Sequence, residues 1–170
     1  MKKTMPAETV AGLLGLFESN GLDVTIDGGW GVDALLGAQT RDHEDLDIAL
    51  PHCQTVKLRE SLGRIGYKEI PRDDTRECNF VLADDEGHEV DVHSYTFDEN
   101  ARNVFGVAYE PEHLTGKGMI QGHAVKCIAP EWLVRFHAGY EPDENDYRDV
   151  KALCERFGIA LPGDFKKFET

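Results

Sequence analysis

Paired carboxylates on a short alternating segment are the first feature of this sequence that can do chemistry. In Asp45-Leu46-Asp47-Ile48, acidic and apolar residues alternate, which is the pattern of a half-buried strand. Residues i and i+2 of a strand project from one face, so Asp45 and Asp47 lie side by side. Adjacent carboxylates repel each other, and a divalent cation removes that conflict. Carboxylate oxygens are the ligands that Mg²⁺ prefers, and phosphates commonly complete its coordination.

A second acidic segment can complete this group. The segment from Glu89 to His93 alternates in the same way, so that Glu89, Asp91 and His93 share one face of a strand. If that strand lies beside the first one, Asp91 completes a cluster of three carboxylates. Such a cluster can hold two metal ions about 3.5–4 Å apart, which clamp the attacking and leaving oxygens of a phosphoryl displacement.

A glycine pair precedes the first acidic strand. Gly28 and Gly29 follow residues 23–27, whose alternation predicts a short strand. Without Cβ atoms, their backbone can approach phosphate oxygens closely and donate N–H groups to them. A DxD strand or a Gly-Gly turn alone has mostly a structural explanation. The combination of a glycine pair, a DxD strand and a later strand with a central aspartate is far more specific.

The remaining periodicity predicts an α/β (α+β) protein with a small mixed sheet, flanking helices and a helical C-terminal part. Hydrophobic spacing and end signals predict helices over residues 7–19, 32–36, 56–65, from 130 onward and 143–157, and strands over 23–27, 45–50, 80–83, 90–95 and 122–128. A turn at residues 84–87 predicts a hairpin. Residues 96–118 carry no assignable pattern. We expect a catalytic domain at 1–128 and a C-terminal helical part at 129–170, packed on the same unit.

Composition restricts the classes of function. The formal net charge of −14, from 32 acidic and 18 basic residues, repels nucleic acid and anionic membranes and attracts cations. The four cysteines contain no CxxC pair, which argues against a disulfide scaffold or a zinc site. No apolar run has the length of a membrane span, and Glu8 interrupts the N-terminal stretch that would otherwise resemble a signal peptide. We expect a cytoplasmic protein that binds neither nucleic acid nor membrane.

The order of these motifs resembles a known family. The segment Asp27-Gly28-Gly29-Trp30-Gly31-Val32-Asp33, followed by residues 39–48, is similar to the signature of small antibiotic nucleotidyltransferases of the polymerase-β-like superfamily. The resemblance covers most of the chain and extends to residues 90–93, to residues 136–140 and to Asp146, Asp149 and Val150; residues 68–87 and 96–120 match poorly. It is strongest to the short lincosamide nucleotidyltransferases and next to the aminoglycoside 2″-nucleotidyltransferases.

This resemblance implies a role for each matching residue. Asp45 and Asp47 would bind the nucleotide-associated Mg²⁺, and Asp91 would bind a second, catalytic Mg²⁺ and act as, or stand next to, the general base. Gly28 and Gly29 would contact the triphosphate of ATP or another nucleoside triphosphate. A hydroxyl would attack the α-phosphate in line and pyrophosphate would leave, with catalysis coming mainly from positioning and charge neutralisation.

Two further nucleotide-site candidates have a competing structural explanation. Arg41 can pair with a phosphate oxygen through its fork of donors, or with the neighbouring side chains of Asp42 or Glu44. Trp30 can stack on the base, although bracing of the glycine loop is favoured over that role. His43 is expected to be structural.

Three residues are candidates for the acceptor site. His93 follows Asp91 on the same strand face and can line that site. Tyr140 and Asp146 fall in the matching C-terminal region, where an acidic cluster at residues 141–149 can recognise a cationic drug. The same cluster can instead be the solvated start of a helix, where acidic residues are favoured by the helix dipole.

Four functions remain open at this point. The leading one is a lincosamide nucleotidyltransferase, because the closer motif match, including residues 136–140, favours it. An aminoglycoside nucleotidyltransferase with the same chemistry is the alternative, because the negative charge suits a polycation better. An antitoxin-like nucleotidyltransferase acting on a protein is the third. A degenerate, non-catalytic nucleotide-binding module is the fourth, and the intact Asp45, Asp47 and Asp91 argue against it. Monomer and homodimer are both open.

Overall fold

The computed structural model describes residues 2–169. The helices are α1 (Ala7–Ser19), α2 (Gly28–Leu36), α3 (Thr55–Gly63), α4 (Pro130–His137) and α5 (Glu144–Phe157), with 3₁₀ turns η1 (His52–Gln54), η2 (Pro111–Leu114) and η3 (Gly163–Phe168). The strands are β1 (Thr25–Ile26), β2 (Asp45–Pro51), β3 (Lys68–Ile70), β4 (Asn79–Ala83), β5 (Glu89–Phe97), β6 (Asn103–Gly106), β7 (Gly116–Ile120) and β8 (His123–Cys127). None of the described helices combines the length and the apolar character that crossing a membrane requires.

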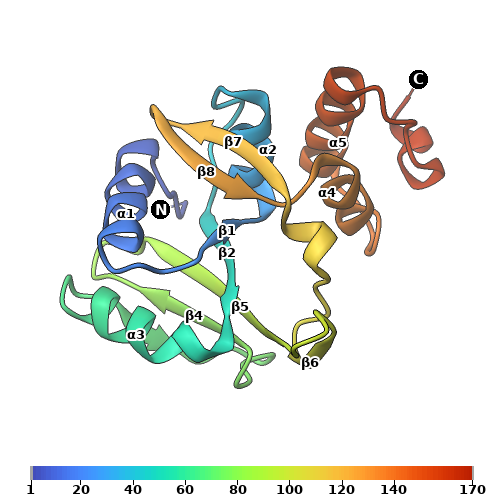
Figure 1. Ribbon diagram of the computed structural model, residues 1–170. Coiled ribbons are helices and arrows are strands. Elements are labelled where there is room, and N and C mark those ends of the chain that lie inside the picture. Colours follow the sequence, from blue (N-terminus) through green and yellow to red (C-terminus); the bar gives the residue numbers. More distant parts are fainter. Residues whose placement is uncertain (1, 170) are drawn as a thin grey trace.

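A single mixed sheet organises the molecule, which confirms the predicted fold class. Its strand order is β3-β4-β5-β2-β1-β8-β7, with β6 paired to β5. The β2–β5 and β1–β8 pairs are parallel, and the other pairs are antiparallel. Figure 1 shows α4 and α5 together beyond α2 and the β7–β8 hairpin, with α3 at the opposite end of the molecule. Of these helices, α2 packs against β2, and α4 and α5 pack against α2.

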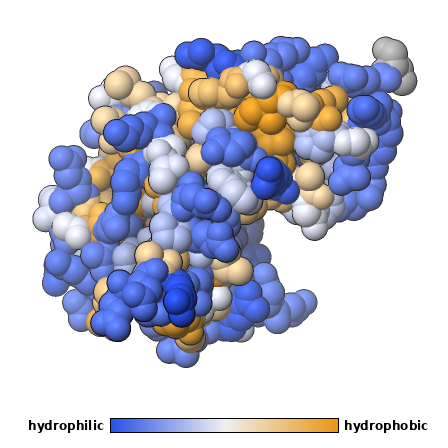
Figure 2. Space-filling model, turned by 45° about the vertical axis from the view of Figure 1, so that its right-hand side comes forward, coloured by the Kyte–Doolittle hydropathy of each residue, from blue (hydrophilic) through white to orange (hydrophobic). Residues whose placement is uncertain are grey.

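The hydrophobic core joins both parts of the chain. Val10, Leu13, Leu14 and Phe17 form the buried face of α1, as the spacing predicts. Residues of the sheet, of α2 and of the C-terminal helices belong to one buried cluster, which includes Trp30, Ile48, Val92, Leu133, Val150 and Leu153. The predicted division at residue 128 thus separates two segments that share one core. Figure 2 shows a mainly hydrophilic face with a hollow between its upper and lower parts.

The first correction concerns the start of α2. The sequence predicts a strand over residues 23–27 and a helix over 32–36, but β1 is only Thr25–Ile26 and α2 already begins at Gly28. The side chain of Asp27 caps this helix by accepting a hydrogen bond from the Gly28 N–H at 2.7 Å. The cap supplies a partner for an otherwise free N–H and offsets the weak helix propensity of the two glycines.

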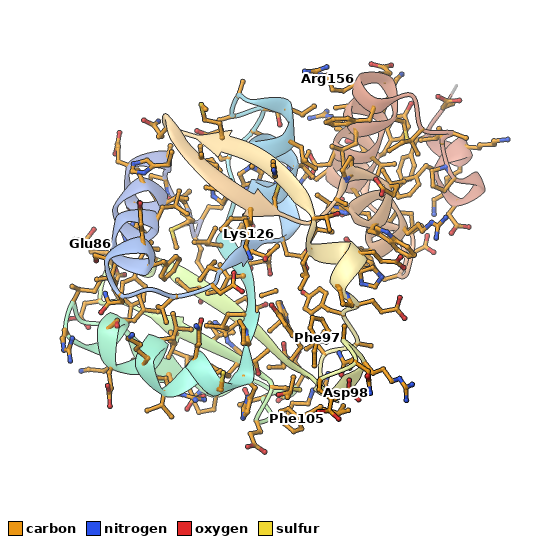
Figure 3. The ribbon with its side chains drawn as sticks, viewed as in Figure 1. Glu86, Phe97, Asp98, Phe105, Lys126 and Arg156 are labelled. Carbon is orange, nitrogen blue, oxygen red and sulfur yellow. The ribbon has the colours of Figure 1, made fainter. Side chains whose placement is uncertain are left out.

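Other element boundaries follow the predictions closely. The β4–β5 hairpin, β8, the start of α4 at Pro130 and the end of α5 before Gly158 are confirmed, whereas α3 ends at Gly63, two residues before the predicted end. Three strands were missed: β3, β6 and β7. β6 pairs with the last residues of β5, and Figure 3 shows Phe97 and Phe105 at that same end of the sheet.

Candidate active site

Four carboxylates form a two-by-two array on the central strand pair. The β2–β5 register sets Asp45 opposite Glu89 and Asp47 opposite Asp91. This parallel pairing meets the condition on which the three-carboxylate prediction depended. The side chains of Asp47 and Asp91 remain 24% and 29% exposed, so both can reach a ligand.

Two of the four carboxylates, those of Asp45 and Asp91, have raised pKa values. Burial, followed by repulsion from Asp47 and Asp91, raises the pKa of Asp45 to about 7. Burial, together with the charge of Asp47, also raises the pKa of Asp91 to about 6, although His93 opposes that rise. Glu89, the fourth carboxylate of the array, has a lowered pKa instead. Burial favours the neutral form of Glu89, but its ion pairs with Lys3 and Arg72 lower its pKa.

This donor set fits a divalent cation. Asp47, Asp91 and His93 each offer one ligand atom within 4.8 Å of the others. The Nε2 atom of His93 lies 3.6 Å from Asp47 Oδ1 and 3.7 Å from Asp91 Oδ1. Burial would lower the pKa of His93, but these two carboxylates raise it to about 9. The cluster therefore attracts positive charge, and its oxygens are the hard ligands that Mg²⁺ takes.

The two glycines lie where side chains cannot fit. Gly28 has φ +60°, and a Cβ added there would lie 2.1 Å from Asp47 Oδ2. A Cβ on Gly29 would lie 2.3 Å from Nδ1 of His43. The backbone at the start of α2 is thus packed directly against one of the clustered carboxylates. A Cβ at either position would have to displace the Asp47 or His43 side chain, and the positive φ of Gly28 independently favours glycine there.

A cavity of about 300 Å³ adjoins the array. Its walls come from the start of α2, the loop before β2, β2 itself and the α4–α5 region; they include Lys2, Gly28, Gly29, Arg41, Asp42, Glu44, Asp45, Asp47, His137, Tyr140, Asp143 and Asp146. The Tyr140 hydroxyl donates to Asp146 Oδ1 at 2.9 Å. The structure thus brings two predicted acceptor residues into the same cavity as Asp45 and Asp47.

Arg41 has a partner that the sequence did not reveal. Its Nε and Nη2 donate to the two carboxylate oxygens of Asp149 on α5, at 3.2 and 2.8 Å, and Nη1 donates to the backbone carbonyl of Asp42. Asp149 is only 2% exposed. The ion pair therefore ties the loop before β2 to the C-terminal helix, and a phosphate contact by Arg41 stays a prediction.

Trp30 and His43 belong to the packing around the site. Trp30 is 2% exposed, and its indole Nε1 donates to the carbonyl of Met5 at 3.2 Å. His43 is buried beside it, with ring centroids 4.9 Å apart, and its Nε2 lies 2.5 Å from Asp33 Oδ2. These contacts favour the bracing role of Trp30 over base stacking, and they agree with the structural role expected of His43.

Sequence reasoning missed two residues that adjoin the array. Asp27 accepts a hydrogen bond from the hydroxyl of Tyr109 at 2.7 Å. An aspartate immediately before Gly28-Gly29 is a recognisable helix N-cap signal. Tyr109 carries no comparable signal, because it lies in the segment over which no periodicity could be assigned.

Comparison with known proteins identifies the family. The profile of the aminoglycoside-2″-adenylyltransferase family matches residues 9–153. The chain belongs to this family. A lincosamide resistance protein of Staphylococcus haemolyticus is 32% identical over 147 residues, which cover 83% of this chain and 89% of that protein. A 2″-aminoglycoside nucleotidyltransferase of Klebsiella pneumoniae is 24% identical over 123 residues, which cover 72% of this chain and 67% of that protein.

Solved structures give the same family resemblance. The lincomycin-bound lincosamide antibiotic adenylyltransferase LnuA has a TM-score of 0.77 at 26% identity, over 93% of this chain and 100% of that one. The aminoglycoside enzyme ANT(2″)-Ia, in complex with adenylyl-2″-tobramycin, has a TM-score of 0.73 at 18% identity, over 96% of this chain and 98% of that one. The second likeness shows a shared fold. The resemblance to small antibiotic nucleotidyltransferases is confirmed.

Proposed function

We propose that this protein transfers a nucleoside monophosphate from a Mg²⁺-bound nucleoside triphosphate, ATP in the first instance, to a hydroxyl of a lincosamide antibiotic, with release of pyrophosphate. One observation carries the proposal: the aligned β2 and β5 strands present the carboxylates of Asp45, Asp47 and Asp91 beside a helix that starts with two glycines. The family match supports the reaction class. The chain's 32% identity to a lincosamide resistance protein supports a lincosamide as the acceptor. We predict that the protein acts in the cytoplasm.

In this proposal the carboxylates of Asp45, Asp47 and Asp91 would hold two Mg²⁺ ions, one of which arrives with the nucleotide. When bound, Mg²⁺ neutralises charge on the attacking and leaving oxygens. Gly29 lies in the first turn of α2, where N–H groups have no partner within the helix and favour a phosphate. Asp91 accepts, or stands next to the group that accepts, the proton of the acceptor hydroxyl.

The cavity supports an acceptor that carries positive charge. Tyr140 and Asp146 offer a hydroxyl and a carboxylate at its α4–α5 side, where they can bind the drug. Carboxylates dominate its walls, and Arg41 is already paired with Asp149. This excess of negative charge also favours the alternative function, an aminoglycoside nucleotidyltransferase, because a polycation gains more from it than a singly charged drug.

Mass spectrometry of a drug panel tests the proposal. Lincomycin, clindamycin, gentamicin and kanamycin are incubated with protein, Mg²⁺ and each nucleoside triphosphate in turn. A lincosamide heavier by one nucleoside monophosphate, with loss of product in Asp47→Asn, supports the proposal. An aminoglycoside as the modified drug supports the alternative. Unmodified drugs from folded protein that binds nucleotide would refute both and direct the search to a protein acceptor.

A further inference from the structure

A partly buried hydrogen bond links a distant loop to the helix start at the site. The hydroxyl of Tyr109 donates to Asp27 Oδ2 at 2.7 Å, across 82 positions of the chain. The other oxygen, Oδ1, accepts the N–H of Gly28 at 2.7 Å. The backbone N–H of Asp27 donates to the carbonyl of Asp47 at 2.9 Å. Asp27 is therefore bonded both to the glycine at the helix start and to the strand that carries Asp47.

The Asp47 carboxylate lies directly against the backbone of Gly28. A Cβ on Gly28 would lie 2.1 Å from Asp47 Oδ2 and 2.8 Å from Asp47 Cγ. The position of the Gly28 backbone therefore limits where the Asp47 carboxylate can lie. Because packed interiors transmit small displacements, movement of Asp27 would move this carboxylate as well.

Tyr109 is itself firmly held. It is 4% exposed, and its ring makes edge contacts with Tyr95 of β5 and Phe136 of α4, at centroid distances of 5.8 and 6.2 Å. The Nδ2 of Asn103 donates to its backbone carbonyl at 2.9 Å. Tyr109 thus fixes Asp27 relative to β5 and to the C-terminal helices.

We infer that Tyr109 and Asp27 are positioning residues that orient Asp47 for metal binding. Tyr109 donates to Asp27, and Asp27 is hydrogen-bonded to Gly28 and to Asp47, so both residues act on the site through Gly28 and Asp47. This inference rests on the proposed function only in its claim that Asp47 is a metal ligand. Loss of a residue hydrogen-bonded directly to a metal ligand typically costs about 10–100-fold in metal affinity or activity; Tyr109 acts through Asp27, so we expect the lower end of this range.

The test compares Tyr109→Phe with Tyr95→Phe. Both rings are buried in the same aromatic cluster, but among the described residues the Tyr95 hydroxyl makes no hydrogen bond that corresponds to the Tyr109–Asp27 bond. Mn²⁺ is titrated into the protein without nucleotide, and free Mn²⁺ is followed by its EPR signal. We expect the Mn²⁺ Kd to rise about tenfold in Tyr109→Phe and to stay at the wild-type value in Tyr95→Phe.

If Tyr109 only stabilises the fold, Tyr109→Phe will have a lower Tm and an unchanged Mn²⁺ Kd. That result would overturn the inference. Asp27→Ser provides a second variant, because serine retains N-capping ability but is too short to reach Tyr109; it should weaken Mn²⁺ binding in the same direction. A wild-type protein that binds Mn²⁺ but modifies no drug refutes the proposed function alone. In that case the comparison of Tyr109→Phe with Tyr95→Phe still decides the inference.

Discussion

Replacing Asp45 with asparagine should make the metal-free protein more stable while abolishing nucleotidyl transfer. Burial and the charges of Asp47 and Asp91 raise the pKa of Asp45 from 3.8 to about 7. The folded state therefore binds this proton more tightly than the unfolded chain does. Above pH 7 the carboxylate is charged in both states, and the folded state bears the full cost of desolvation and repulsion.

The raised pKa sets the size of the effect. The difference between 3.8 and about 7 corresponds to about 4 kcal/mol of destabilisation at pH 8, as an upper bound. Because Asp45 is partly exposed, solvent screening reduces the expected gain from Asp45→Asn to about 2 kcal/mol. For a chain of this length that gain corresponds to an increase in Tm of about 4–8 °C.

Differential scanning calorimetry in the presence of EDTA measures this gain. It should be largest above pH 7 and decline steadily between pH 7 and pH 4, since protonation removes the repulsion from the wild-type protein. Mg²⁺ should reduce the Tm difference between Asp45→Asn and the wild type, because it stabilises the wild type more than the variant. Asp23→Asn is the control, since Asp23 is 48% exposed and pairs with Lys126 at the surface, where such pairs contribute about 0–1 kcal/mol. A lower or unchanged Tm in Asp45→Asn at pH 8 would refute the account of the carboxylate array.

Three further substitutions test other parts of the site. Gly28→Ala should reduce kcat by at least about 100-fold in steady-state assays, because its Cβ would collide with the carboxylate of Asp47, a proposed metal ligand. Gly12→Ala, where a Cβ meets open space, should leave kcat unchanged. Equal kcat values in the two variants would contradict the proposed role of Gly28. Arg41→Gln should lower the free energy of unfolding by about 3–5 kcal/mol in urea, because it leaves the buried Asp149 unpaired. Adding Asp149→Asn should restore part of the lost stability. A double variant no more stable than Arg41→Gln would show that the unpaired carboxylate is not the cause. Tyr140→Phe should raise the KM for the drug severalfold with little change in kcat, whereas an unchanged KM would remove Tyr140 from the acceptor site.

Local patterns in the sequence determined much of the secondary structure and several candidate site residues. The apolar spacing of α1 and its Asn20-Gly21 end follow from side-chain periodicity and from the positive φ of Gly21. The alternation around Asp45 and Asp47 likewise dictates which side chains share a face of β2. These features depend on neighbours a few residues apart, so a single sequence contains the necessary information.

Tertiary structure decided which distant groups meet. The parallel pairing that brings Asp91 opposite Asp47 could be stated only as a condition, because strand adjacency depends on the packing of the whole sheet. The partner of Arg41 lies 108 positions away, and the pairing of Tyr109 with Asp27 spans 82 positions. No local periodicity encodes such contacts.

The missed strand β7 shows why some local patterns mislead. Gly116 and Gly118 resemble strand breakers in the sequence. In the structure, a Cβ on Gly116 would lie 2.5 Å from the carbonyl oxygen of Cys127, and one on Gly118 would lie 2.4 Å from that of Ala34. The glycines are therefore required because backbone of β8 and α2 packs directly on this strand. The sequence by itself determined which residues alternate and which carboxylates are candidates for metal binding. The close packing of distant backbone decided where glycines are needed and which residues hold the candidate site in place.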